Sequence, residues 1–299
     1  MKTGLLTKNR KVFIWCLFDW ANSPYPTVIL TFVFSAYFTK LVAEDEISGT
    51  FLWSQTIAFS GLFMAVIAPI LGAISDETGK KKIWILVFSI LAILATMNLW
   101  FVLPDKKSVP LALIAIAISL IAFEFCTIFY NATLIQVANS SSIGKVSGLG
   151  WAAGYIGAII CLLICLFGLV ERNFSFLRLD IDQSEHIRAT TIVVGLWWFI
   201  FSLPFFIFFK EGKEAAHFSS RHILEGLKRL FTTIKNIKHY RPIMLFLLAR
   251  MFYADGLLVV FQFGGIYAAG TFGMTFSEIL KFGIAMNIFA GLGAFVFAW

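Results

Sequence analysis

Charged residues are scarce in this chain, and their scarcity indicates the class of protein. Only 14% of the 299 residues are charged, whereas 59% are hydrophobic and the mean hydropathy is +0.85. Soluble domains are about a quarter charged and roughly half apolar. Binding to nucleic acid would require the basic residues behind the net charge of +7 to gather on a soluble surface. The sequence therefore predicts an all-α polytopic membrane protein that binds no nucleic acid.

Cysteine and histidine are also sparse, which excludes several kinds of site. All four cysteines fall within apolar runs, so they indicate neither a disulfide framework nor a metal site in a loop. The four histidines lie in connecting segments and lack the spacing of zinc ligands. We therefore expect no bound metal, no cofactor and no enzymatic activity.

Apolar runs long enough to cross a bilayer fill most of the chain, since a span needs about 20 apolar residues. Eight runs reach this length: 12–40, 51–75, 83–103, 111–138, 148–170, 189–209, 242–269 and 278–299. Alternate connections hold 16 and 6 Lys and Arg residues. The positive-inside rule then predicts a cytoplasmic N-terminus. We expect a multi-pass protein of the cell membrane, in a bacterium the inner membrane.

The longest connection divides the chain into unequal parts. Within 210–241, apolar residues recur at helical spacing between lysines and arginines, which predicts a basic amphipathic helix on the inner leaflet. The expected domains are a six-helix bundle over 1–209, a cytoplasmic linker over 210–241 and the start of a second bundle over 242–299. Because the chain stops at Trp299, after eight spans, we expect it to lack four spans of a twelve-span protein.

The turn between the second and third spans contains a spaced motif of glycine, aspartate and lysine. It resembles the cytoplasmic loop signature of the major facilitator superfamily, although Glu77 departs from that pattern. The matching residues are Gly72, Asp76, Gly79, Lys81 and Lys82. We expect Gly72 to allow close helix approach and Asp76 to cap a neighbouring helix. The alternative is a plain positive-inside turn.

Three further stretches narrow this resemblance. Residues 18–38, 146–160 and 246–261 resemble the unknown-major-facilitator family, which includes a fungal vacuolar amino-acid effluxer linked to autophagy. The resemblance implies a secondary transporter with two six-helix halves around a central cavity, monomeric when complete. It also implies that spans 1, 4, 7 and 10 line that cavity.

The first span contains the unusual stretch FDWANSPYP at 18–26. Pro24 and Pro26 remove backbone donors and free the carbonyls of Trp20 and Asn22. Together with Asp19, these groups predict a polar patch suited to a solute or ion. The alternative is a packing kink that a neighbouring helix satisfies.

Ionisable residues inside spans are costly and usually functional. They occur in spans 1, 4 and 7 as Asp19, Glu124, Arg250 and Asp255. We expect the substrate and proton pathway to contain Asp19, Asn22, Glu124, Asn131, Arg250, Asp255 and Gln262. Counting the rise along the helices places Asp19, Glu124 and Arg250 in one layer, so we expect Arg250 to bridge to Asp19 or Glu124. We expect Glu124 to carry the proton, because Asp19 has Asn22 and the freed carbonyls beside it. The alternative is a static buried triad that only orients the helices.

Three glycines in the fifth span, Gly150, Gly154 and Gly157, are expected to serve close helix packing.

The expected function is proton-coupled export of a small polar solute, an amino acid or similar metabolite, by alternating access. The expected partners are that solute, the proton or another coupling ion, and the lipid bilayer. Two alternatives remain. One is a non-transporting remnant or membrane scaffold. The other is a membrane-embedded enzyme, which would need a catalytic cluster at an interface, and the sequence contains no such cluster.

Overall fold

A computed structural model describes residues 2–171, 179–211 and 241–297, together with Lys228, Thr232 and Lys235. Within these ranges the regular structure is entirely helical. The amphipathic helix expected within 210–241 lies outside the described residues, apart from those three positions. The side chains of Asp76 and Glu77 lie outside them as well, so the expected helix cap by Asp76 stays a prediction.

The eight expected spans are confirmed: the described part of the chain contains eight helices long and apolar enough to cross a membrane. Those spans are Asn9–Val42, Glu46–Gly72, Lys81–Phe101, Lys106–Val137, Ile143–Val170, Glu185–Phe208, Arg241–Gly270 and Phe276–Val296. No bound differs from the expected one by more than five residues. The protein is therefore a multi-pass membrane protein.

Each span is built from one or more helical elements. The bounds are α1 Lys2–Asn22, η1 Tyr25–Phe32, α2 Phe34–Tyr37, η2 Phe38–Val42, α3 Glu46–Thr78, α4 Lys81–Asn98, η3 Leu99–Phe101, η4 Lys106–Ser108, α5 Val109–Asn131, α6 Leu134–Val137, α7 Ile143–Cys165, η5 Leu166–Val170, α8 Glu185–Phe208, α10 Arg241–Gly270 and α11 Phe276–Phe297. The first span is the most interrupted of them, because π-helical segments η1 and η2 follow α1.

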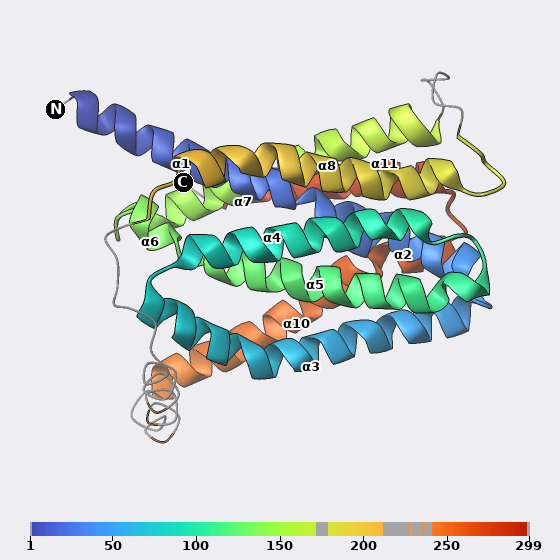
Figure 1. Cartoon of the computed structure of the whole chain (residues 1–299), viewed down its shortest axis with the longest axis horizontal. Coiled ribbons are helices and arrows are strands. Elements are labelled where there is room, and N and C mark those ends of the chain that lie inside the picture. Colours follow the sequence, from blue (N-terminus) through green and yellow to red (C-terminus); the bar gives the residue numbers. More distant parts are fainter. Residues whose placement is uncertain are drawn as a thin grey trace.

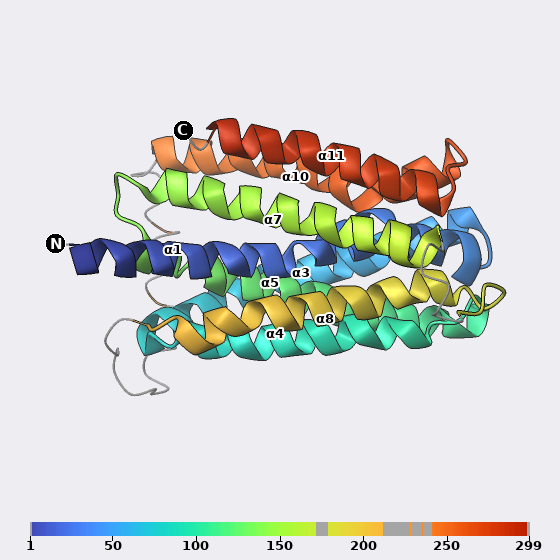
Figure 2. The same ribbon diagram turned by 90° about the horizontal axis from the view of Figure 1, so that it is seen from above.

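The spans run side by side, with both chain termini at one end (Figure 1). We name this the inner end; it includes the turn at Gly79–Lys80 and the start of α1. The outer end includes the turns at Asp45 and Lys106. Seen from above, α8 and α4 lie on one side of α1, and α7, α10 and α11 lie on the other (Figure 2).

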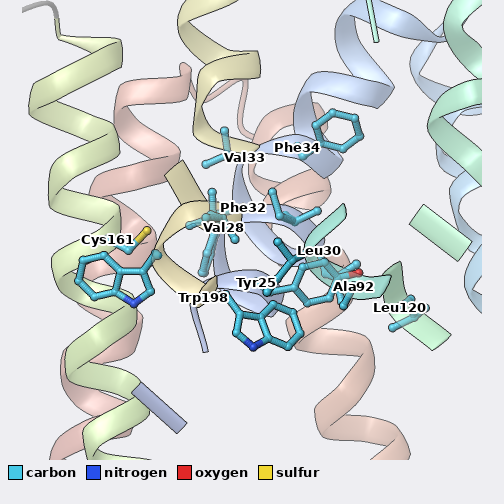
Figure 3. Packing of buried hydrophobic residues seen from close by; sticks show 14 of the residues in the cluster. Tyr25, Val28, Leu30, Phe32, Val33, Phe34, Ala92, Leu120, Cys161 and Trp198 are labelled. Atoms are coloured by element: carbon cyan, nitrogen blue, oxygen red, sulfur yellow. The ribbon is translucent and has the colours of Figure 1, made fainter. Parts of the chain in front are cut away.

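The core is centred on the first span. Within its most apolar window 78% of the residues are buried, compared with 6% in α3 and none in α10. Tyr25 and Val28 of η1 pack among residues of the surrounding helices, including Leu120, Cys161 and Trp198 (Figure 3). Many apolar side chains of α3, among them Phe59, Leu62 and Val66, are exposed, as expected for a helix in contact with lipid, whereas Trp53 is buried against the core.

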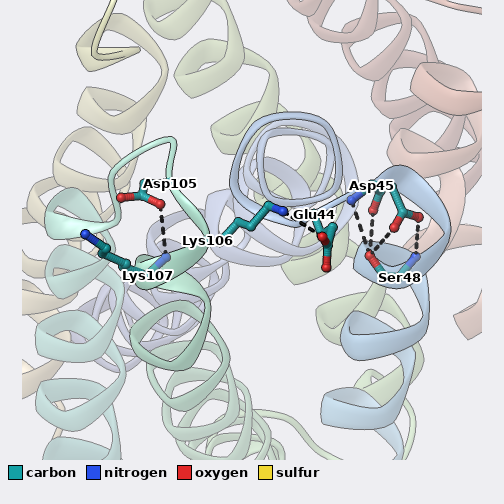
Figure 4. Close-up of polar contacts among 6 residues, drawn as sticks. All are labelled: Glu44, Asp45, Ser48, Asp105, Lys106 and Lys107. Atoms are coloured by element: carbon teal, nitrogen blue, oxygen red, sulfur yellow. Dashed lines mark hydrogen bonds and ion pairs between the residues drawn. The ribbon is translucent and has the colours of Figure 1, made fainter.

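The outer turns are fixed by local polar contacts (Figure 4). Asp45 caps α3 by accepting hydrogen bonds of 2.9 Å from the amides of Ile47 and Ser48. Glu44 pairs with Lys106 at 2.7 Å and thereby ties the first outer turn to the second. The cap thus marks the start of α3, and the ion pair joins the two outer turns.

The predicted loop motif at the inner end is partly explained by the structure. Gly79 ends α3 with φ of +64°, a left-handed conformation that favours glycine. The Lys82 ammonium donates to the carbonyl of Phe209 at 2.7 Å and so holds the end of α8. The expectation for Gly72 is wrong: nothing lies within 4 Å of a Cβ placed there, because this part of α3 lies apart from its neighbours.

Candidate functional site

The break in the first span is stabilised by a neighbouring helix. Pro24 follows the end of α1 and precedes the π-helical turns of η1. The carbonyl of Trp20, which Pro24 cannot bond, accepts a hydrogen bond from the indole of Trp197 in α8 at 3.1 Å. At this carbonyl the structure favours the packing-kink alternative over a polar patch open to solute.

A glycine face of α7 allows α1 to approach closely, as expected. A Cβ at Gly150 would collide with the Asp19 carboxylate and the Trp15 ring. A Cβ at Gly154 would collide with the Ser23 hydroxyl, and one at Gly157 would lie 2.6 Å from the Trp20 carbonyl oxygen. The prediction of close helix packing is confirmed. These glycines place α7 directly against the polar segment of span 1.

Asp19 is half-buried and held by α5. The Tyr130 hydroxyl lies 2.9 Å from Oδ2 of Asp19 and 2.8 Å from the carbonyl of Trp15, so its single proton can be donated to either oxygen. The Trp15 indole donates in turn to the Thr133 hydroxyl at 3.1 Å, and its ring stacks on Tyr130. The sequence reasoning did not single out Trp15, Tyr130 or Thr133. The feature of the sequence that could have indicated them is the presence of their polar side-chain atoms near the inner ends of apolar spans.

Glu124 lies on α5, half-buried within the helix bundle. Among the described residues it forms no hydrogen bond and no ion pair. Tyr25 of η1 lies close enough to interact with it electrostatically, while the Tyr25 hydroxyl donates to Ser119 at 2.8 Å. An unpaired carboxyl at this depth can gain and lose a proton without breaking a structural contact.

The remaining expected site residues are not brought together. Arg250 and Asp255 on α10 are exposed, and so is Asn131 at the end of α5, whereas Asn22 and Gln262 are buried. The expected bridge from Arg250 to Asp19 or Glu124 is not formed. The reason is that α10 packs on span 1 only near its outer end.

The outer ends of the last two spans are joined to the first six. At Gly265 of α10, a Cβ would collide with the carbonyl of Thr31 in η1. The Lys40 ammonium donates to the carbonyl of Met274 at 3.3 Å. At the end of η5, Glu171 pairs with Lys281 of α11 at 2.6 Å and accepts from the Ser277 hydroxyl at 2.7 Å. We call these interactions the outer contact.

The charge of Glu171 is stabilised within the outer contact. Lys281 and Ser277 both bind its carboxylate, and together they hold the pKa of Glu171 below its usual value. The ion pair is therefore present at neutral pH and is lost only as the pH falls through that lowered pKa.

Comparisons with known proteins match both parts of the chain. Residues 3–161 match the family described as Major Facilitator Superfamily. Residues 135–299 match the family described as Vacuole effluxer Atg22 like. No solved structure is a significant match.

Three curated relatives illustrate the similarity. The uncharacterized MFS-type transporter YxiO of Bacillus subtilis (strain 168) is 30% identical over 261 residues, which cover 85% of this chain and 59% of the relative. Autophagy-related protein 22-1 of Aspergillus fumigatus is 25% identical over 177 residues, 56% of this chain and 28% of the relative. A protein of Aquifex aeolicus (strain VF5) is 24% identical over 283 residues, 94% of this chain and 63% of the relative. The chain spans less than two thirds of the length of each of these relatives.

Proposed function

Because the chain belongs to the major facilitator superfamily and to its vacuole effluxer Atg22-like family, we propose that it acts in secondary transport of a small polar solute. Its relatives point to transport rather than to catalysis. We further propose that the solute is an amino acid or similar metabolite, that it is exported, and that export is coupled to protons.

The proposed proton coupling rests on the surroundings of the Glu124 carboxyl. This carboxyl is half-buried in a membrane span and has no hydrogen-bond or ion-pair partner among the described residues. A static structural carboxylate at such a position would normally be paired, because an isolated charge in a low-dielectric site is costly. A group that alternates between charged and neutral forms has no need of a permanent partner.

The exposed part of α10 holds charges of both signs. Its residues 243–260 are mostly exposed and include Arg250 and Asp255, whereas the outer contact holds α10 and α11 against the first six spans. Both side chains are therefore accessible to a solute. Arg250 could pair with the carboxylate of an amino acid and Asp255 with its ammonium at successive points of its passage, because the five-residue spacing places the two side chains on different faces of α10.

The test of this function is a counterflow assay with a panel of radiolabelled amino acids. The 299-residue chain is reconstituted in liposomes loaded with each unlabelled amino acid, and uptake of the labelled compound is followed. Export of an amino acid predicts transient accumulation of at least one panel member. A chain that remains folded and moves no panel member would instead support the remnant or scaffold alternative.

A second test concerns the outer contact. Replacing Glu171 with glutamine removes its ion pair with Lys281, so we expect a state open at the outer end to become more populated. Spin labels at Leu103→Cys and Phe272→Cys measure the distance across the outer end, and the open state gives a longer distance. In Glu171→Gln the fraction of molecules with the longer distance should rise about two- to fivefold, which corresponds to the loss of a partly exposed ion pair.

The matched control for this test is Glu44→Gln. It removes an outer ion pair of similar length, but Glu44 lies in the turn between the first two spans and Lys106 at the start of the fourth, so the pair does not involve the last two spans. The control should leave the distance distribution unchanged. An equal response of the two variants would contradict the assignment of Glu171 to closure.

A further inference from the structure

A groove lies at the inner end of the molecule, away from the pathway residues. It lies between the start of α4 and the residues that follow α8, and its volume is about 460 Å³. The lining is of two kinds: charged residues at one end, including Lys80 and Lys82, and apolar residues beyond them, including Ile83, Leu86 and Phe206. This volume is within the range of ligand sites in proteins.

The charged part of the groove has the character of an anion site. Lys80 is exposed and has no hydrogen-bond or ion-pair partner in the described part of the chain. Among the described residues, the Lys82 ammonium contacts only the neutral carbonyl of Phe209, so no described carboxylate cancels its charge and it retains further donors. Glu211, the one acidic residue of the described lining, accepts from the backbone amide of Lys82 at 2.6 Å. Within the described lining, the two lysines and the positive N-terminus of α4 therefore exceed the single carboxylate in charge.

The apolar part of the groove faces the surroundings of the protein. Ile83 is 56% exposed and Leu86 is 38% exposed, on the first turns of a helix that enters the membrane. At a rise of about 1.5 Å per residue, Leu86 lies roughly 9 Å deeper than Lys80. The groove thus extends from the level of lipid headgroups to the level of acyl chains.

We infer that this groove binds one anionic phospholipid of the inner leaflet. The lipid phosphate is held by Lys80 and Lys82, and an acyl chain lies along Ile83, Leu86 and Phe206. A soluble anion would use the lysines but not the exposed apolar lining, which favours a lipid as the occupant. Basic sites of this kind, at the cytoplasmic ends of membrane helices, suit anionic headgroups.

The experiment is native mass spectrometry of the full chain in detergent, titrated with phosphatidylglycerol or phosphatidylcholine. We expect preferential binding of one phosphatidylglycerol. In Lys80→Ala its affinity should fall about fivefold, the effect of one lysine near an anionic headgroup. The matched control, Lys11→Ala, removes an exposed lysine of the inner end outside the groove and should change affinity less than twofold.

A second variant, Leu86→Trp, fills the apolar part and leaves every charge in place. Leu86→Trp should weaken phosphatidylglycerol binding as well. In the unmodified chain, soluble glycerol phosphate should not compete with phosphatidylglycerol for the groove. Equal binding of both lipids would overturn the inference, as would equal losses in Lys80→Ala and Lys11→Ala. Effective competition by glycerol phosphate would overturn it in favour of a soluble phosphate compound.

Discussion

Replacing Glu124 with glutamine is expected to abolish proton-driven accumulation of the solute while leaving solute exchange within about twofold of the original rate. Glutamine has nearly the same size but cannot ionise, and Glu124 has no hydrogen bond in the described structure that the change would break. The measurement compares uptake driven by an imposed pH gradient with exchange in its absence, both in liposomes.

The control for this experiment is Glu44→Gln, which neutralises an exposed carboxylate of the outer turn. It should retain both accumulation and exchange. Undiminished accumulation in Glu124→Gln would refute the assignment of the proton to this residue. Loss of both activities would identify Glu124 as a group needed for solute binding or folding instead.

A second large effect is expected from adding a single methyl group to α7. In Gly157→Ala the new Cβ would lie 2.6 Å from the carbonyl oxygen of Trp20, a backbone atom that cannot move alone. We expect the free energy of unfolding to fall by about 1–3 kcal/mol, the usual cost of overpacking. Unfolding in detergent, followed by circular dichroism against added denaturant, measures this change.

The same substitution at Gly61 provides the matched control. Nothing lies within 4 Å of a Cβ at Gly61 in α3, so only helix propensity changes. Alanine there should leave stability unchanged or raise it by up to about 1 kcal/mol. If the two alanine variants had equal stability, the close approach of α1 and α7 would not contribute to the fold.

The sequence predicted the spans well because hydrophobic length is a property of each segment alone. The packing role of Gly150, Gly154 and Gly157 was also predictable, since glycines at helical spacing form one face whichever helix lies opposite. In both cases the sequence pattern alone is sufficient: the length of an apolar run decides whether a segment can span the membrane, and the glycine spacing decides whether a helix face allows close approach.

The arrangement of the charged residues was not predictable in the same way. Counting residues gives the depth of Arg250 but neither the tilt of α10 nor the direction in which its side chains point. The structure places the inner two thirds of α10 apart from α1, so a shared depth does not produce an ion pair. Likewise, the bond from Trp197 to the Trp20 carbonyl joins positions 177 residues apart, and no local pattern indicates it.

The π-helical segment η1 has a mechanical consequence for the first span. A π turn holds one residue more than an α turn, so converting one such turn to α-helix would rotate the outer half of the span by about 100° relative to the inner half. Phe32 packs against Phe282 of α11, and Thr31 lies against Gly265 of α10, so both would turn away from these partners. Asp19, on the inner half, would keep its place beside Tyr130. One change of helical winding could thus separate span 1 from α10 and α11 at the outer end while the inner half of the span stays fixed, and the Glu171–Lys281 pair would remain.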